Sequence, residues 1–407
     1  MATKELQAIV DAWGRARRDG CPAALVTVTR TSGSTYRRAG ARMLVLAAPD
    51  GEVSSVGADF LGSISGGCLE DDARDRAREA IATDRAATAR YDTTAEGDVL
   101  YGSGLGCQGV VEVLIEPLPA EGARAPGADA ARPADPVACI AWSLRERRAG
   151  VLASVVAAEG PGEGVTARAG DFLWLAEGGE PVTAIAEPEL AVLVAADAQN
   201  ALTRGRTTTR EYALPGGRRV EVFIDVIRPP RSLLICGAGY DAVPLARLGK
   251  ELGWRVRVVD GRKAYAVPER FPGVDELVHC PPPQFAARVA VEPGEAAMVM
   301  THNFLHDREM LRALLGSHAG YIGVLGPQKR TARLLEELAA EDGGRAARTI
   351  LSARSLRRLH GPAGLDIGAE APEQIALAIV AEIEAVSARR KGGVLKRRKG
   401  ALHVPAL

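Results

Sequence analysis

Beyond residue 231 the sequence alternates between short apolar segments and amphipathic segments, and this alternation restricts the possible folds more than any other feature. The apolar segments have the length and composition of strands and lie at residues 232–236, 255–260, 276–280, 296–301 and 321–326. The amphipathic segments have helical periodicity and lie at about 240–252, 284–290, 306–316 and 328–341. Strands that alternate with helices form a parallel sheet with helices on both faces. We therefore predict an α/β domain over residues 232–387, in which Pro372 opens the last helix.

The first of these strands ends in a glycine-rich turn of the type that binds dinucleotides. The turn reads Gly237-Ala-Gly239-Tyr-Asp-Ala, and Asp260 ends the next strand 23 residues after Gly237. Such glycines let the backbone approach a phosphate at the start of the helix, and an acid at the second strand end binds the ribose. The sequence therefore predicts a Rossmann-type, doubly wound domain with Gly237, Gly239 and Asp260 as candidate cofactor-binding residues. Whether the turn still binds a nucleotide stays open, and Arg262 leaves NAD and NADP as alternatives.

Two further groups of polar residues lie where strands of this domain end. Lys329 and Arg330 follow Gly326 at the start of a helix, where cations oppose the helix dipole and a bound anion would remove the conflict. The alternative is that both side chains extend into solvent. His302 and His306 are four residues apart, but they have no evident third ligand, and we expect them to serve the start of a helix rather than a metal.

Residues 1–228 have a different pattern, which predicts an N-terminal α/β domain with mixed or antiparallel strands. Helices are expected at 4–19 and about 69–82, and strands at 23–29, 42–47, 109–115, 151–157 and 220–227. Residues 117–136 are rich in Pro, Ala and Gly, which indicates a flexible linker. Residues 137–227 are expected to add short, mostly antiparallel strands. Arg228-Pro-Pro-Arg231 marks the next boundary, and the basic residues 388–407 are expected to form a disordered tail.

The loop between the first two strands concentrates hydrogen-bond donors. Glycines at 33 and 40 flank most of this set, which comprises Ser34, Thr35, Arg37, Arg38 and Arg42. Guanidinium groups match the geometry of phosphate and carboxylate, and the backbone amides of a Gly-rich loop add to them. The density of donors favours an anion-binding loop, with a solvated hairpin as the alternative.

Two of the six cysteines lie in Gly-rich segments. Cys68 follows Gly66 and Gly67, and Cys107 follows Gly106. A thiolate is the reactive and metal-binding form of cysteine, and Gly-rich loops allow a flat ligand to approach the backbone. Cys107 is the better candidate, because an acidic helical turn beside Cys68 opposes a thiolate there. The remaining cysteines are expected to be packing residues, namely Cys21, Cys139, Cys236 and Cys280.

The overall composition excludes several classes of protein. Lys and Arg total 51, as do Asp and Glu, so no net charge attracts the chain to nucleic acid. No apolar segment is long enough to span a bilayer, and the first residues lack the pattern of a signal peptide. The scattered cysteines form no C-x-x-C pair. We therefore expect a soluble cytoplasmic protein with reduced thiols.

Several blocks of sequence, taken in order, carry a resemblance to a known family. In the N-terminal part they are "TRTSGSTYRRAGARM", "GSISGGCLE" and "GLGCQGVVEVLIEP". In the C-terminal part they are "GAGYDAVPLARLGKELGWRVRVVDGR", "MTHNFLHD", "YIGVLGPQKR" and "GPAGLDIGAEAPEQIALAIVAEI". These blocks resemble the XdhC/CoxI family of xanthine dehydrogenase and carbon monoxide dehydrogenase maturation factors. Gln108 departs from the family pattern, because a small residue is expected there.

The resemblance implies an accessory factor, rather than an enzyme, that binds the molybdenum cofactor (molybdopterin). Such proteins protect the cofactor while a sulfido ligand replaces an oxo ligand, and then pass it to an apo molybdenum hydroxylase. A cysteine desulfurase would supply the sulfur, and a homodimer is expected from the frequency of that state. On this hypothesis we assign Arg37, Arg38 and Arg42 to the pterin phosphate and expect Cys107 or Cys68 to lie near the molybdenum, from ligand chemistry alone. Soft sulfur and anion-binding donors suit such a group.

Two other functions stay open at this stage. The Gly237 turn, taken at face value, indicates an NAD(P)-dependent oxidoreductase, for which His302 is the candidate acid or base. A purely scaffolding partner of a dehydrogenase would need neither the Arg-rich loop nor the two Gly-flanked cysteines.

Overall fold

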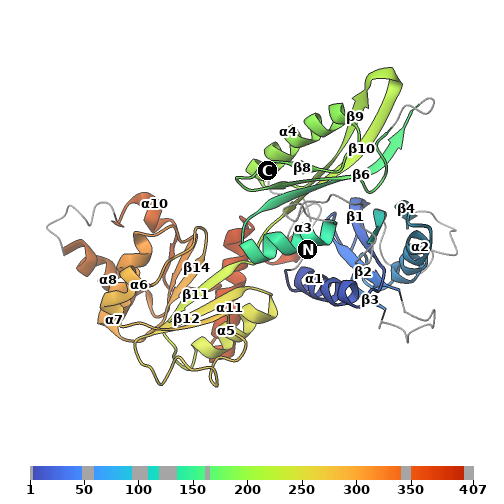
Figure 1. The fold of residues 1–407 in the computed structure, drawn as a ribbon. Helices are drawn as coiled ribbons and strands as arrows, with labels where there is room; N and C mark the ends of the chain where they lie inside the picture. Colours follow the sequence, from blue (N-terminus) through green and yellow to red (C-terminus); the bar gives the residue numbers. More distant parts are fainter. Residues whose placement is uncertain are drawn as a thin grey trace. The chain divides into compact units, whose positions relative to one another are not determined.

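The computed structural model describes residues 3–47, 59–93, 109–118, 135–160, 166–340 and 350–397. The chain divides into an N-terminal unit, Met1–Pro229, and a C-terminal unit, Pro230–Leu407 (Figure 1). Gly106, Cys107, most of the expected linker and the end of the expected basic tail lie outside the described residues. In the part of the chain that is described, no helix has the length and apolar content needed to cross a membrane.

The C-terminal unit is a parallel sheet with helices on both faces, which confirms the predicted Rossmann-type fold. Its strands are β11 (Ser232–Cys236), β12 (Arg255–Asp260), β13 (Glu276–His279), β14 (Ala296–Val299), β15 (Tyr321–Val324) and β16 (Leu359–His360). They lie in the order β13-β12-β11-β14-β15-β16, and each neighbouring pair is parallel. Strand β16 spans only two residues, which explains why the sequence pattern did not reveal it. The order reverses between β11 and β14, and open α/β sheets bind ligands at such a switch point.

Helices cover both faces of this sheet because its strands are apolar on both sides. The helices are α5 (Ala242–Glu251), α6 (Phe285–Arg288), α7 (Phe304–Leu315), α8 (Gln328–Ala340), α10 (Ala353–Leu356) and α11 (Pro372–Ser387). In β11, Leu233 and Ile235 pack into a core with α5 and α11. Their neighbours Leu234 and Cys236 pack into a second core with α7 and α8. A strand buried on both faces reads as a continuous apolar run, which is the signal that predicted this sheet.

The first half of the N-terminal unit is an antiparallel sheet in the order β3-β2-β1-β5-β4. Its elements are α1 (Thr3–Arg18), β1 (Ala23–Gly33), β2 (Arg42–Leu46), β3 (Phe60–Gly62), α2 (Glu70–Thr83), β4 (Ala87–Asp92) and β5 (Gly109–Leu118). One face of the sheet packs on α2 through residues such as Val26 and Ala77. The other face packs on α1 through residues such as Leu25 and Trp13.

The second half repeats this arrangement in the order β8-β7-β6-β10-β9. Its elements are α3 (Pro136–Glu146), β6 (Gly150–Glu159), β7 (Phe172–Ala176), β8 (Val182–Thr183), α4 (Pro188–Arg204), β9 (Thr208–Leu214) and β10 (Arg218–Ile227). The antiparallel strands confirm the predicted fold class. The sequence pattern predicted only short strands here and did not reveal the two helices. In α4 the exposed Val192 and Leu193 lie beside the buried Leu190 and Val194, which obscures the helical period.

The two halves correspond in detail, so the N-terminal unit is an internal structural repeat. The first strand of each half has a bulge at its seventh residue, Thr29 in β1 and Val156 in β6. The glycine two residues before the second strand has φ +90° in one half (Gly40) and +89° in the other (Gly170). These matches allow the strands of the two halves to be aligned. A feature that occurs in only one half is then not required by the shared fold.

Candidate functional site

Several segments with candidate binding residues meet at one end of the first sheet. The Arg-rich loop joins β1 to β2, the Cys68 loop follows β3, and Gly109 opens β5, so the antiparallel pairing places all three together. A Cβ atom on Gly66 would lie 3.0 Å from Cδ1 of Tyr36. A Cβ atom on Gly109 would lie 2.5 Å from the carbonyl oxygen of Ser34. We term this surface, made of residues 34–38, 63–69 and Gly109, the candidate site.

Glu70 organises the Cys68 loop from inside. Its carboxylate, in a residue that is only 4% exposed, accepts hydrogen bonds of 2.9–3.3 Å from the backbone N–H groups of Ile64, Ser65, Gly66, Gly67 and Leu69. The hydroxyls of Ser63 and Ser65 donate to it as well. Burial alone raises the pKa of Glu70, but these hydrogen bonds outweigh burial and hold the pKa at about 2. The loop is therefore built around an internal anion, and its amides are not available to a ligand.

Cys68 is presented to solvent by this rigid loop. The residue is exposed, its thiol is free, and its backbone N–H donates to the Ser65 hydroxyl at 3.2 Å. The sequence predicted that the acidic turn beside Cys68 opposes a thiolate there. Glu70 belongs to this turn, but its carboxylate points into the loop and accepts hydrogen bonds from the loop amides. Cys107, the better candidate by sequence, lies outside the described residues together with Gly106.

The three arginines of the predicted anion site have different surroundings. Arg37 donates two hydrogen bonds to Glu5 of α1, at 3.1 and 2.6 Å. Arg42 is 1% exposed and donates to Asp225 of β10 at 2.7 Å and to the Gly40 carbonyl at 3.1 Å. Arg38 is exposed. Arg37 and Arg42 thus support the loop within the protein, and Arg38 is the most exposed of the three.

The two hydroxyl residues of the loop also differ. Ser34 is exposed, whereas Thr35 is half-buried and its hydroxyl donates to the Arg37 carbonyl at 2.9 Å. Ser34 and Arg38 are therefore the donors of the predicted set that face solvent.

Behind the loop, Arg42 lies in a buried polar cluster where the two halves of the unit meet. Glu116 of β5 is 4% exposed. Burial raises the pKa of Glu116 to about 7, although the charge of Arg42 and a hydrogen bond from Ser154 act in the opposite direction. Asp225 also accepts a hydrogen bond from Thr207 at 2.8 Å. This cluster joins the base of the Arg-rich loop to the second half of the unit.

The second half of the unit lacks the Cys68 loop. Its helix α4 ends in a left-handed cap at Gly205, as α2 does at Asp84. Alignment on these caps places Glu187, Pro188, Glu189 and Ala191 opposite Gly66, Gly67, Cys68 and Glu70. The repeated fold therefore forms without the glycines, the thiol or the internal carboxylate. The topology that the two halves share therefore does not depend on these residues.

At the switch point of the C-terminal unit, the predicted nucleotide-binding residues make contacts within the protein. A Cβ on Gly237 would lie 2.5 Å from the Met300 carbonyl oxygen, so this glycine allows two strand ends to approach. Asp260 is buried and accepts from the Ala238 N–H at 2.6 Å and from the Arg262 guanidinium at 2.8 and 2.9 Å. Burial raises the pKa of Asp260, but these hydrogen bonds lower it below its usual value. Both carboxylate oxygens of Asp260 are occupied where a ribose would bind.

A second acid lies at the start of α5. A carboxylate oxygen of Asp241 lies 2.8 Å from Nε2 of His302, within hydrogen-bonding distance, and a Cβ on Gly239 would lie 2.7 Å from Asp241 Oδ1. Gly239 thus makes room for this carboxylate, which stands where a pyrophosphate would approach the helix. His302 has φ +60° and an exposed ring. Within the described residues, no group of three or more His, Cys, Asp or Glu side chains is arranged to hold a metal.

Lys329 and Arg330, at the start of α8, also differ from each other. Lys329 is exposed, whereas Arg330 donates to the buried Asp307 at 2.7 Å. Arg330 thus has an anionic partner from the protein itself, and Lys329 extends into solvent, which is the alternative that the sequence left open for it.

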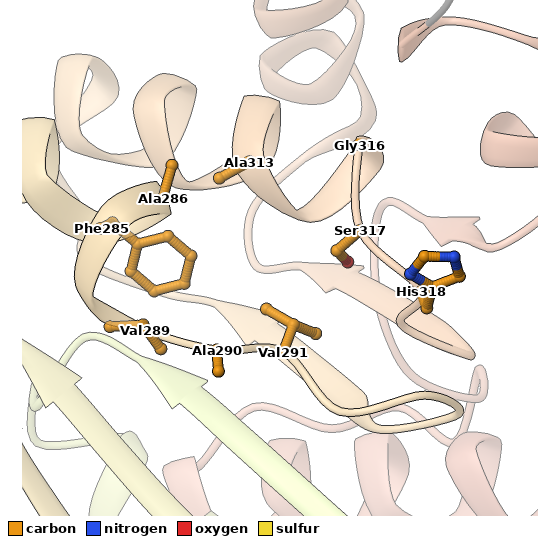
Figure 2. A pocket seen from close by; sticks show the side chains of 9 residues that line it. All are labelled: Phe285, Ala286, Val289, Ala290, Val291, Ala313, Gly316, Ser317 and His318. Carbon is orange, nitrogen blue, oxygen red and sulfur yellow. The ribbon is translucent and has the colours of Figure 1, made fainter.

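A pocket of about 270 Å³ in the C-terminal unit is lined by none of these residues (Figure 2). Phe285 and Val289 form part of an apolar wall, and Ser317 and His318 lie at one side. Val291 and His318 precede β14 and β15, so the pocket lies toward the amino ends of these strands, opposite the edge where the switch point opens. Apart from Ser317 and His318 its lining residues are apolar or glycine, so it offers no set of groups suited to catalysis.

Comparisons with known proteins agree with this division of the chain. Residues 16–92 match the model of the XdhC and CoxI family, and residues 233–383 match that of the XdhC Rossmann domain. A relative from Bacillus subtilis (strain 168), described as a probable xanthine dehydrogenase subunit, is 30% identical over 366 residues, which is 89% of this chain and 92% of the relative.

The chain belongs to the XdhC and CoxI family.

Other similarities are more limited. An uncharacterised protein of Escherichia coli (strain K12), YqeB, is 30% identical over 184 residues, which is 44% of this chain and 32% of that protein. A crystal structure from Bacillus halodurans, described as a xanthine dehydrogenase, has a TM-score of 0.69 and 24% identity and covers 95% of this chain and 96% of that one. At this identity the likeness shows the fold. The XdhC and CoxI match includes both loops of the candidate site.

Sequence reasoning missed three residues: Tyr36, which lies in the candidate site, and Glu70 and Asp225, which hold its loops in place. Glu70 gave a weak signal, because an acid after Ser and Gly residues at a helix start is typical of a capping arrangement. Tyr36 gave none, since a single tyrosine in a polar loop is common. Asp225 lies 183 positions from Arg42, and only the tertiary structure reveals that pair.

Proposed function

We propose that this protein is an accessory factor in the maturation of a xanthine dehydrogenase-type molybdenum hydroxylase. It binds the molybdenum cofactor at the candidate site, protects it during sulfuration by a cysteine desulfurase and passes it to the apo-enzyme. The observation that carries the proposal is the Cys68 loop, which presents an exposed thiol on a rigid, Gly-rich support that the sister half of the unit lacks. Family membership and the description of the Bacillus subtilis relative support the connection to xanthine dehydrogenase.

The chemistry of the exposed groups fits such a cargo. A cysteine sulfur is a soft ligand that suits molybdenum, and the Arg38 guanidinium suits the phosphate of the pterin. Glu70 keeps the loop in one conformation, so the thiol is positioned before the cargo arrives. Arg37 and Arg42 contribute by holding the Arg-rich loop in place. The five described cysteines are free thiols, which supports action in a reducing compartment such as the cytoplasm.

The test is retention of isolated molybdenum cofactor by the full-length protein. The purified protein is mixed with cofactor anaerobically and desalted, and molybdenum and pterin are then quantified. We expect one cofactor per chain, because only the first half of the N-terminal unit carries the Cys68 loop. Cys68→Ala and Arg38→Ala should lower retention, while Cys21→Ala, at a half-buried cysteine on another loop, should not. Absence of retention by the wild type would refute cofactor binding.

The alternative, an NAD(P)-dependent oxidoreductase, has less support from the geometry. A dinucleotide in the usual position would meet Asp241 at its pyrophosphate and an Asp260 whose oxygens are already occupied. We therefore expect NADH fluorescence to remain unchanged during titration with the protein. Tight NADH binding with turnover of a carbonyl substrate would favour the oxidoreductase instead.

A further inference from the structure

Two consecutive glycines leave a bare strip of backbone in the candidate site. Gly66 has φ +156° and Gly67 has φ +112°, conformations in which a side chain would be strained. Apart from Gly67 and its two chain neighbours, no atom of the described residues lies within 4 Å of the point that a Cβ on Gly67 would occupy. Hydrogen bonds to Glu70 hold both amides, so the strip is rigid as well as bare. A planar ligand can therefore reach van der Waals contact with the backbone here.

An aromatic ring borders the strip at Gly66. A Cβ on Gly66 would lie within 3.3 Å of three ring atoms of Tyr36, so ring and backbone are in close contact, yet Tyr36 remains 71% exposed. The following residue, Arg37, is held toward α1 by its two hydrogen bonds to Glu5. The loop is thus anchored on one side of Tyr36, and the ring keeps most of its surface open to solvent. Cys68 borders the other end of the strip.

The sister half of the unit shows that the fold does not require this arrangement. Glu187 and Pro188 stand where Gly66 and Gly67 lie, and Glu187 accepts a hydrogen bond from Arg218 at 2.8 Å. Side chains and an internal ion pair replace the bare strip in that half. The uncovered strip beside the Tyr36 ring is therefore not required by the repeated fold.

We propose that Tyr36 is a positioning residue on which the pterin ring system of the cofactor stacks, with the edge of the pterin resting on the Gly66–Gly67 strip. This inference rests on the proposed cofactor-binding function. Aromatic side chains stack on flat nitrogen heterocycles, as they do on nucleobases. Stacking on Tyr36 would direct the remainder of the cofactor along the strip toward the Cys68 thiol. Tyr36 would thereby set the orientation in which the metal end meets the soft ligand.

The experiment compares four full-length proteins for affinity toward isolated molybdenum cofactor under anaerobic conditions. They are the wild type, Tyr36→Leu, Tyr36→Phe and the control Val192→Ala, which changes an apolar side chain of equal exposure (71%) in α4. Retained molybdenum and pterin are measured at a series of cofactor concentrations. We expect a Kd about tenfold higher, or more, for Tyr36→Leu, the typical effect of losing one stacking partner. Tyr36→Phe and Val192→Ala should match the wild type in affinity, and all four proteins should melt at the same temperature.

The outcomes separate this inference from the proposed function. Retention by the wild type with an unchanged Kd in Tyr36→Leu would overturn the role of Tyr36 while the cofactor site stands. An equal loss of affinity in Tyr36→Leu and Tyr36→Phe would overturn stacking, since the effect would then come from the phenolic hydroxyl. A wild type that retains no cofactor would overturn both the function and the inference.

Discussion

Replacing Glu70 with Gln is expected to destabilise the N-terminal unit at neutral pH and to loosen the Cys68 loop. The carboxylate of Glu70 accepts from five backbone N–H groups and two hydroxyls. A glutamine keeps the size of the side chain, but it brings an NH₂ group into a site lined with donors. At least some of those amides would then lose their acceptor inside the protein.

The magnitude follows from the pKa of Glu70, which is lowered from 4.5 to about 2. Each pKa unit corresponds to about 1.4 kcal/mol, so the ionised form stabilises the folded state by about 3 kcal/mol at pH 7. Because the folded-state pKa is the lower one, this stabilisation is complete above pH 4.5. It is lost as the pH falls toward 2. The stability difference between wild type and Glu70→Gln should therefore be constant from about pH 7 to 5 and shrink below that range.

Calorimetric melting of the full chain measures this difference. For a unit of this size, a loss of about 3 kcal/mol lowers the melting temperature by about 6–12 °C. The control is Glu79→Gln, which removes an exposed glutamate from the same helix and should leave the transition unchanged. Equal melting temperatures for wild type and Glu70→Gln would refute the reasoning. A deficit that persists unchanged at about pH 3.5 would also refute it, because it would not depend on the charge.

Three further predictions concern the surroundings of the candidate site. Burial raises the pKa of Glu116 from 4.5 to about 7, so ionisation of this side chain destabilises the folded state as the pH rises above 4.5. Glu116→Gln should therefore have the stability of the wild type at pH 4.5. At about pH 8 the variant should be up to about 3 kcal/mol more stable than the wild type, as measured by urea unfolding. Arg42→Leu should lower the free energy of unfolding by about 3–5 kcal/mol in the same assay, because the buried Asp225 carboxylate loses its cationic partner. Adding Asp225→Asn to that variant should restore part of the loss. If the effects of the two substitutions simply added, the pairing would be contradicted. Gly109→Val should displace the Ser34 carbonyl and reduce cofactor retention, and unchanged retention would show that this contact is unimportant for binding.

The C-terminal unit could be predicted well from the sequence because the necessary information is local. A parallel sheet buried on both faces needs continuous apolar strands, and the chain carries them at β11, β14 and β15. The same local patterns indicated both loops of the candidate site, since Gly-rich segments with Arg or Cys stand out wherever they lie. They located the Gly237 turn as well, but they could not reveal that Asp241 and Asp260 have partners within the protein.

The repeat in the N-terminal unit was hidden from the sequence, because the two halves share topology and bulge positions while their side chains differ. Where Gly66 and Gly67 stand in one half, Glu187 and Pro188 stand in the other. Backbone hydrogen bonding tolerates such replacements as long as the apolar pattern survives, so the fold is retained while sequence similarity is lost.

The sequence by itself indicated which segments are candidates for binding, namely the Arg-rich loop, the Cys68 loop and the Gly237 turn. The tertiary structure decided which side chains in them face solvent. Arg42 and Asp225 are far apart in the chain and meet only when the two halves pack together, while Glu70 turns inward because five amides surround it. A charged side chain is placed by the partners that compensate its burial, and those partners come from the whole fold rather than from neighbouring residues.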